Sequence, residues 1–389
     1  RHPTARILIA SFADNNLGAY KKCFEALYLQ MKQVYNHYIK VDYVGLHPVS
    51  QFLGVSITRD RVLKTLTLCQ AGYIKRVSDN RKGKFELRDS PIPNTKLARD
   101  NFMKMTTATC DADKCDRSEY LGVMGEMGWV IGMTMGEYCG LFSFLGTFMQ
   151  NPSKTNLAAA YHVYGNIVQM KDFGITYGGE LRIPMGLTSM PDNFLASHGL
   201  HYYHDSSWGK PRPLGGHCML YYGGATNWLG TGLKTETDST AEAETAVASR
   251  ASKDARFHKL LHEDMGCPSP GPVTAVTDNK ALHDLVNKPG ASARTRYFER
   301  ATRFVKYAQK MLYIKLFLIS THFMVADIFT KPLEPSLFYR FRNYMKNVRN
   351  TGHGSTTGES LRQSNTRITS AMHKLQAFVA EHARLSRFV

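Results

Sequence analysis

Three aspartates stand where predicted strands end or predicted helices begin, positions that can bring carboxylates together. Asp205 ends a strand of alternating apolar and polar residues, Asp278 follows a short β-rich run, and Asp327 begins a new helical segment. Carboxylate oxygens are the hard ligands that Mg²⁺ and Mn²⁺ prefer. The pattern predicts a two-metal phosphoryl-transfer site, in which ions roughly 4 Å apart hold the scissile phosphate, activate the attacking water and stabilise the leaving 3′ oxygen.

A fourth acid comes from the start of a long predicted helix. Ser239 or Thr240 can cap this helix, and acidic residues suit its first turn because of the helix dipole. Glu242 and Glu244 are both placed to join the aspartates, and residue type alone leaves the choice open. A single acid at a strand end is more often a turn former or a cap than a ligand, so the signal lies in the order and spacing of the set.

The charge balance points to a polyanionic partner. The 389 residues include 49 Lys and Arg against 32 Asp and Glu, a formal net charge of +17. Each phosphate that a basic side chain neutralises releases condensed counterions, so such an excess favours RNA or another nucleic acid. A basic surface that only keeps the protein in solution is the plainer alternative. The length suggests two or three domains.

Cysteine usage and hydropathy indicate an intracellular protein without a membrane anchor. The seven cysteines are odd in number and scattered, which is typical of reduced thiols rather than a disulfide framework. Cys110 and Cys115 have no second Cys/His pair at zinc spacing, so we expect no zinc site. The most apolar stretch, 121–149, is interrupted by glutamates and glycines and predicts a helical hairpin, not a bilayer span. The first residue is Arg1 rather than Met, as expected of a processed product or a fragment.

Pattern and composition divide the chain into four segments. Residues 1–90 alternate predicted strands and helices, residues 91–195 are mainly helical after a Pro-rich linker, and residues 196–349 follow the order β-β-β-α-β-α-α-β-α. That order favours an α/β sandwich with a mixed sheet. Residues 350–389 combine a Gly/Ser/Thr/Asn-rich linker with a basic tail.

The tail, 366–389, has the spacing of an amphipathic helix. Six residues, most of them apolar, fall on one face at helical spacing: Ile368, Met372, Leu375, Val379, His382 and Leu385. An apolar helix face of this kind is expected to pack against another surface. Docking onto this same chain and docking onto a protein or ribonucleoprotein partner both remain open.

Five short motifs follow one another over some 130 residues of the carboxyl-terminal half. They are His204-Asp205-Ser206-Ser207-Trp208, Ser239-Thr240-Ala241-Glu242-Ala243-Glu244, Asp278-Asn279-Lys280, Arg294-Thr295-Arg296-Tyr297-Phe298-Glu299 and Ala326-Asp327-Ile328-Phe329-Thr330-Lys331-Pro332-Leu333. In this order they resemble the motifs of the ribonuclease H domain of copia-type (Pseudoviridae) retrotransposon polyproteins.

The resemblance implies a ribonuclease H-like mixed sheet flanked by helices over 196–349. It also implies the catalytic and metal-binding set, which is Asp205, Glu244, Asp278 and Asp327. Glu244 is chosen over Glu242 because the Glu-Ala-Glu alignment favours the second glutamate. Mg²⁺ or Mn²⁺ is the implied cofactor. Asn279 is a candidate for bonding a ribose hydroxyl, and Arg294 and Arg296 are candidates for meeting phosphates. Trp208 is interpreted as a core residue rather than a stacking platform.

The resemblance extends into the first half of the chain. Segments of 51–75 look like the reverse-transcriptase stretch that follows the catalytic hairpin, so 1–90 is expected to be a truncated palm and thumb remnant and 91–195 a helical connection. The family's Tyr-Val-Asp-Asp appears here as Phe12-Ala13-Asp14-Asn15. An amide is a poorer Mg²⁺ ligand than a carboxylate, and the rest of the palm is expected upstream of Arg1. The sequence therefore predicts that polymerase activity is lost.

Two functions from different classes fit these observations. The first is a ribonuclease H that cleaves RNA in RNA–DNA hybrids. The second is a domesticated, non-catalytic RNA-binding subunit of a large ribonucleoprotein such as an organellar ribosome. The first predicts a nuclear or cytoplasmic retroelement product, and the second predicts a mitochondrial protein.

Overall fold

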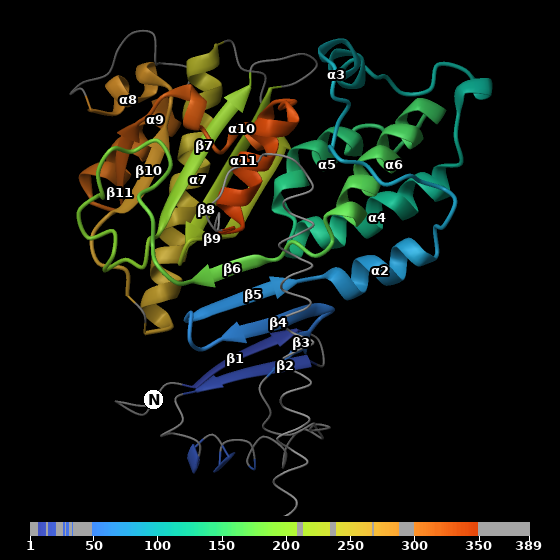
Figure 1. The fold of residues 1–389 in the computed structure, drawn as a ribbon. Helices are drawn as coiled ribbons and strands as arrows, with labels where there is room; N and C mark the ends of the chain where they lie inside the picture. The colour runs from blue at the N-terminus through green and yellow to red at the C-terminus, as the bar shows by residue number, and fades with distance from the viewer. Residues whose placement is uncertain are drawn as a thin grey trace, which may run out of the picture. The chain divides into compact units, whose positions relative to one another are not determined.

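The structure is a computed structural model that describes residues 49–207, 213–233, 239–266, 268–287 and 299–348, with strand residues 7–12 and 15–20 and helical positions 26, 27, 29, 30 and 33. Figure 1 shows how these elements are arranged. They all belong to one unit that ends at Val348. None of the helices in this part of the chain is both long enough and apolar enough to span a bilayer. The predicted tail helix at 366–389 lies outside the described residues.

The carboxyl-terminal half is built on a five-stranded mixed sheet in the order β11-β10-β7-β8-β9. Its strands are β7 (His201–Ser207), β8 (Leu214–Tyr221), β9 (Gly224–Gly232), β10 (Val273–Thr277) and β11 (Ile314–Leu318). β10 runs parallel to both β11 and β7, whereas β8 is antiparallel to both β7 and β9. β7 and β10 are buried along almost their whole length, which is the pattern of strands covered on both faces.

Helices cover the two faces of this sheet, as the neighbours of two glycines in β8 show. A Cβ atom on Gly215 would meet Val247 of helix α7, whereas one on Gly216 would meet Phe329 of helix α10. Successive side chains of a strand point to opposite faces, so α7 and α10 lie on opposite sides. The helices of this half are α7 (Thr240–Asp264), α8 (Lys280–Asn287), α9 (Glu299–Lys310), α10 (Asp327–Thr330) and α11 (Pro335–Met345).

A second, antiparallel sheet has the order β3-β4-β5-β6. Its strands are β3 (Gln51–Phe52), β4 (Val55–Asp60), β5 (Thr65–Cys69) and β6 (Ile175–Gly178). Between β5 and β6 the chain forms α2 (Ala71–Asp79), α3 (Lys96–Met103), α4 (Arg117–Met133), the 3₁₀ helix η3 (Gly136–Tyr138), α5 (Cys139–Gly146) and α6 (Lys154–Gln169). β6 belongs to the predicted connection and pairs with β5 of the predicted polymerase remnant, so these two segments share a sheet.

The first described strands form a hairpin. β1 (Ile7–Phe12) and β2 (Asn15–Tyr20) are antiparallel, and Phe12 pairs with Asn15 at the closed end. The strands expected within 1–90 therefore include these two. Ala13 and Asp14 of the degenerate polymerase motif lie outside the described residues.

The predicted α/β class is confirmed. The element order predicted for 196–349 is found, with the single-turn helix α10 added before α11. One large core cluster extends from the connection into this half and includes Val123 of α4, Tyr203 of β7 and Phe329 of α10. A second cluster lies under α7 and includes Ala251 and Leu282. The connection helices therefore share a core with the face of the sheet that carries α10; the boundaries at 90 and 195 stay predictions.

Candidate metal centre

The sheet register places Asp205 and Asp278 side by side. Tyr203 of β7 is the parallel partner of Val276 of β10, and each aspartate comes two residues later in its chain. Side chains two residues apart in an extended chain point to the same face. Tyr203 and Val276 both belong to the core cluster on the α10 side, so the two carboxylates are directed to that side as well.

Asp327 reaches the same place from the first residue of α10. The oxygens of Asp205, Asp278 and Asp327 that could serve as ligands all lie within 4.8 Å of one another. Asp205 and Asp327 are buried, whereas Asp278 is partly exposed. The cluster therefore meets the surface at Asp278, where a substrate phosphate could approach. Asp205 lies in β7, Asp278 directly after β10 and Asp327 at the start of α10.

Glu244 lies beside this cluster on α7. The Ser239 hydroxyl accepts a hydrogen bond from the Glu242 backbone N–H at 3.2 Å, so Ser239 is the residue that caps the helix. Glu244 then falls on the buried face, where its Oε1 accepts a hydrogen bond from the Ser206 backbone N–H at 3.1 Å. Its Oε2 is buried without a hydrogen-bond partner. Of the two candidate glutamates, Glu244 is the buried one, although it is not within the 4.8 Å group.

Burial and mutual repulsion perturb the acids strongly. Burial, together with the charges of Asp327 and Asp278, raises the pKa of Asp205 to about 7, although Lys331 and Thr330 oppose the shift. Burial and the nearby Asp205 raise the pKa of Glu244 to about 8. Burial also raises the pKa of Asp327. Such shifts mean that the ionised cluster lacks sufficient positive charge from the protein.

The chemistry of the donors fits a divalent cation. The carboxylates supply hard oxygen ligands, and the buried Oε2 of Glu244 lacks a partner. A divalent cation would favour the ionised forms of the acids and would give that oxygen a charged neighbour. Asp205, Glu244, Asp278 and Asp327 are therefore suited to hold Mg²⁺ or Mn²⁺.

Two residues that the sequence motifs contained without an assigned role also touch the cluster. The Thr330 hydroxyl donates a hydrogen bond to Oδ2 of Asp205. The Lys331 Nζ donates to Oδ1 of Asp327 at 2.7 Å and lies 3.5 Å from both carboxylate oxygens of Asp205. The i, i+4 spacing of Asp327 and Lys331 was the signal that could have suggested this contact.

Asn279 has a structural contact that the sequence did not predict. Its Oδ1 accepts a hydrogen bond from the Leu282 backbone N–H at 2.9 Å, which caps the start of α8. This bond fixes the turn that carries Asp278. Arg294 and Arg296, the other expected nucleic-acid contacts, lie outside the described residues. Trp208 also lies outside them.

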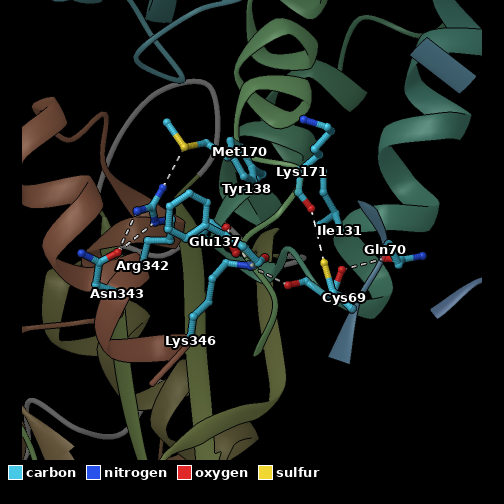
Figure 2. A network of polar contacts seen from close by, with 12 residues as sticks. Cys69, Gln70, Ile131, Glu137, Tyr138, Met170, Lys171, Arg342, Asn343 and Lys346 are labelled. Carbon is cyan, nitrogen blue, oxygen red and sulfur yellow. Dashed lines mark hydrogen bonds and ion pairs between the residues drawn. The ribbon is translucent and has the colours of Figure 1, made fainter. Parts of the chain in front are cut away.

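A buried ion pair joins α11, the helix that follows α10, to the connection (Figure 2). The Lys346 Nζ is 3.2 Å from Oε1 of Glu137 and donates to the backbone oxygens of Thr134 and Phe173 at 2.8 and 3.0 Å. Both charged side chains are 1% exposed. Burial lowers the pKa of Lys346, and Glu137 opposes that shift.

Arg342 continues the same network one turn earlier on α11. Its guanidinium lies 4.4 Å from the ring centroid of Phe173 and 4.5 Å from that of Tyr339, and it donates to Oδ1 of Asn343 at 2.7 Å. Arg342 is fully buried, and its cation–π contacts with the two rings stabilise its charge away from water. The network fixes α11 against the connection and so restrains the segment that carries Asp327.

The fold and site define a mixed α/β protein with a carboxylate cluster near the carboxyl ends of β7 and β10, two adjacent inner strands of a five-stranded sheet. Its homologues are retrovirus-related Pol polyproteins of plant transposons. The chain is 22% identical over 307 residues to the polyprotein of transposon TNT 1-94 of Nicotiana tabacum, covering 76% of this chain and 21% of that protein. It is 21% identical over 253 residues to the polyprotein of transposon RE1 of Arabidopsis thaliana, covering 64% and 16%. The chain thus spans 21% and 16% of the length of these relatives. No model of a known protein family matches it.

Proposed function

We propose that the chain derives from the Pol polyprotein of a copia-type retrotransposon and that residues 196–349 form a ribonuclease H-like domain cleaving RNA in RNA–DNA hybrids. The observation that carries the proposal is the convergence of Asp205, Asp278 and Asp327 within 4.8 Å from three separate segments of the chain. The mixed sheet and the element order support it. The similarity to Pol polyproteins supports the origin.

In this proposal Asp205, Glu244, Asp278 and Asp327 hold Mg²⁺ or Mn²⁺. The bound ions supply an activated water and stabilise the charge on the leaving oxygen. The chain's own polar groups keep the ligands in place, since the Thr330 hydroxyl bonds to Asp205 and the Ser206 N–H bonds to Glu244. The net charge of +17 favours the phosphates of a hybrid.

The test is cleavage of a labelled RNA–DNA hybrid in Mg²⁺ by the parent chain and by Asp278→Asn. The parent is expected to cut the RNA strand, and Asp278→Asn is expected to lose at least about a hundredfold in rate, because a carboxylate ligand becomes a neutral amide. Asp192→Asn is the matched control, since Asp192 is an exposed acid paired with Lys315 at 3.3 Å. Equal rates for the parent and Asp278→Asn would refute the assignment.

The proposal includes the loss of polymerase activity. Asn15 stands where a carboxylate would be needed, and an amide neither carries charge nor binds Mg²⁺ well. We expect no nucleotide incorporation above background on a primed template. Incorporation that depends on the added chain would contradict this part of the proposal.

A second candidate is a non-catalytic RNA-binding subunit of a ribonucleoprotein such as an organellar ribosome. The +17 charge favours it, as does the pairing of Lys331 with Asp327, which supplies a protein cation to the acidic cluster. In that case the tail 366–389 would bind the partner. Salt-sensitive RNA binding without hybrid cleavage, together with co-purification with ribosomal proteins at fixed stoichiometry, is the expected result for this candidate.

A further inference from the structure

Lys331 is held against the acidic cluster by the local backbone. It follows the single turn of α10, its backbone N–H donates to the Asp327 carbonyl oxygen at 2.9 Å, and its own conformation is extended. Pro332 comes next and cannot continue the helix. The turn therefore brings the lysine side chain back over Asp327.

The contacts of the ammonium group are unequal. It donates to Oδ1 of Asp327 at 2.7 Å, a charge-assisted hydrogen bond of ordinary length, and lies 3.5 Å from each carboxylate oxygen of Asp205. The two acids are 3% and 7% exposed as side chains, whereas Lys331 is 36% exposed. The ammonium group can thus move into solvent because the lysine side chain is flexible, whereas the buried carboxylates cannot.

We propose that Lys331 is an internal counter-ion that holds Asp205 and Asp327 together in the metal-free protein and competes with divalent cations for them. This inference rests on the proposed metal centre and adds a way of regulating it. Oδ1 of Asp327 accepts the hydrogen bond from Lys331, so a metal ion that takes this oxygen displaces the ammonium group. The single positive charge of Lys331 offsets only part of the negative charge of the clustered acids. A divalent ion offsets more of it and can therefore displace the ammonium group.

Thr330 keeps the ligands in place while the ions exchange. Its hydroxyl donates to Oδ2 of Asp205 and carries no charge that would repel a metal ion. Asp205 therefore retains a fixed orientation after Lys331 leaves. Lys331 acts through the two carboxylates and is a positioning residue of the site.

The experiment compares Mn²⁺ binding by calorimetry, and thermal unfolding in EDTA and in Mn²⁺, for the parent and Lys331→Met. In EDTA the variant is expected to melt at a lower temperature, because the clustered acids have lost their counter-ion. Mn²⁺ is expected to bind the variant about tenfold more tightly, a ratio that corresponds to about 1.4 kcal/mol. Mn²⁺ should also raise its melting temperature by more than it raises the parent's.

Two further variants make the result decisive. Lys315→Met removes an exposed lysine paired with Asp192 and should leave Mn²⁺ affinity unchanged. Lys331→Gln keeps a polar side chain of similar reach and should also bind Mn²⁺ more tightly, in case the methionine variant folds poorly. A purely structural lysine would lower the melting temperature equally in EDTA and in Mn²⁺.

The outcomes separate this inference from the proposed function. Unchanged or weaker Mn²⁺ binding by both Lys331 variants, with Mn²⁺ bound by the parent, would overturn the counter-ion while leaving the nuclease proposal intact. If neither the parent nor the variants bind Mn²⁺, the metal centre itself is absent and both proposals fail.

Discussion

The backbone at Gly140 of α5 lies directly against Phe329 of α10: a Cβ atom on Gly140 would come within 2.4 Å of the Phe329 carbonyl oxygen. Phe329 is two residues after Asp327, so the connection touches the segment that carries one of the acids. Gly230 of β9 approaches Gly140 from the sheet, where a Cβ on Gly230 would be 3.0 Å from the Gly140 nitrogen. The connection thus acts as a rigid support for one side of the candidate site.

Gly140→Ala should therefore impair the site from a distance. The added methyl meets backbone atoms, which cannot be relieved by a rotamer change, so α10 must shift; we expect a loss of about 1–3 kcal/mol in the free energy of unfolding. Mn²⁺ affinity and hybrid cleavage should fall with it, because Asp327 moves. Urea denaturation and calorimetry would measure both effects.

The matched control for that change lies in the same helix. A Cβ on Gly146 would have nothing within 4 Å, so Gly146→Ala should cost little and leave Mn²⁺ binding intact. A Gly140→Ala variant as stable as Gly146→Ala would show that the close approach does not restrain α10.

The buried pair of Glu137 and Lys346 should be strongly coupled. Lys346→Met leaves the Glu137 carboxylate buried without its cation, and we expect a loss of about 3–5 kcal/mol. The double change Glu137→Leu with Lys346→Met removes both charges and should recover much of that stability. A double-mutant cycle by urea denaturation measures the coupling.

A surface pair provides the comparison for this cycle. Lys84 and Glu119 are 2.9 Å apart, with side chains 53% and 24% exposed, so their coupling should not exceed about 1 kcal/mol. Similar coupling energies for the two pairs would mean that burial does not make the connection pair special.

Sequence patterns predicted the local parts of the site and missed its long-range parts. The strand 273–277 is β10, and the capped helix that carries Glu244 begins where expected, because strand alternation and capping are encoded within a few residues. The contact of Gly140 with Phe329 and the pair of Glu137 with Lys346 join residues about two hundred positions apart. Such contacts depend on tertiary packing, which one sequence does not reveal.

Asn279 illustrates a different limit. Its position after a strand and beside Asp278 suggested contact with a ribose, yet its side-chain oxygen caps α8. Asparagine suits both roles, because the same amide can accept from a backbone N–H or bond to a ligand. The capping bond depends on the position of Leu282 relative to Asn279, which is a property of the fold, and the contact with a ribose stays a prediction.

Acid should destabilise the protein through His201. This ring is buried, with Nδ1 2.6 Å from the Gly199 carbonyl oxygen and Nε2 2.8 Å from the Tyr344 hydroxyl. Burial lowers the pKa of His201 to about 4 from 6.5, although the bond to Gly199 opposes the shift. The unfolded chain therefore takes up the proton first, so stability is lost as pH falls below 6.5. Between pH 7 and pH 5 this histidine should cost about 2 kcal/mol.

The pH effect of His201 is isolated by comparison with His201→Gln. The glutamine variant should start from a lower stability at pH 7, because it fits the two hydrogen bonds less well, but should lose about 2 kcal/mol less than the parent between pH 7 and pH 5. Parallel pH curves for the parent and His201→Gln would contradict the assignment.

The two glutamates of α7 should differ in their effect on metal binding and not in their effect on stability. With a pKa of about 8, raised by burial and by Asp205, Glu244 is largely protonated at pH 7 when no metal is bound. Glu244→Gln resembles that neutral form and keeps the acceptor for the Ser206 N–H, so the free energy of unfolding should change by less than about 1 kcal/mol. Mn²⁺ affinity should nevertheless fall about tenfold or more, because an anionic ligand is lost.

Glu242→Gln is the matched control, at the partly exposed start of the helix, and should leave Mn²⁺ affinity unchanged. Calorimetry measures both affinities. A larger loss of Mn²⁺ affinity for Glu242→Gln than for Glu244→Gln would reverse the choice between the two glutamates.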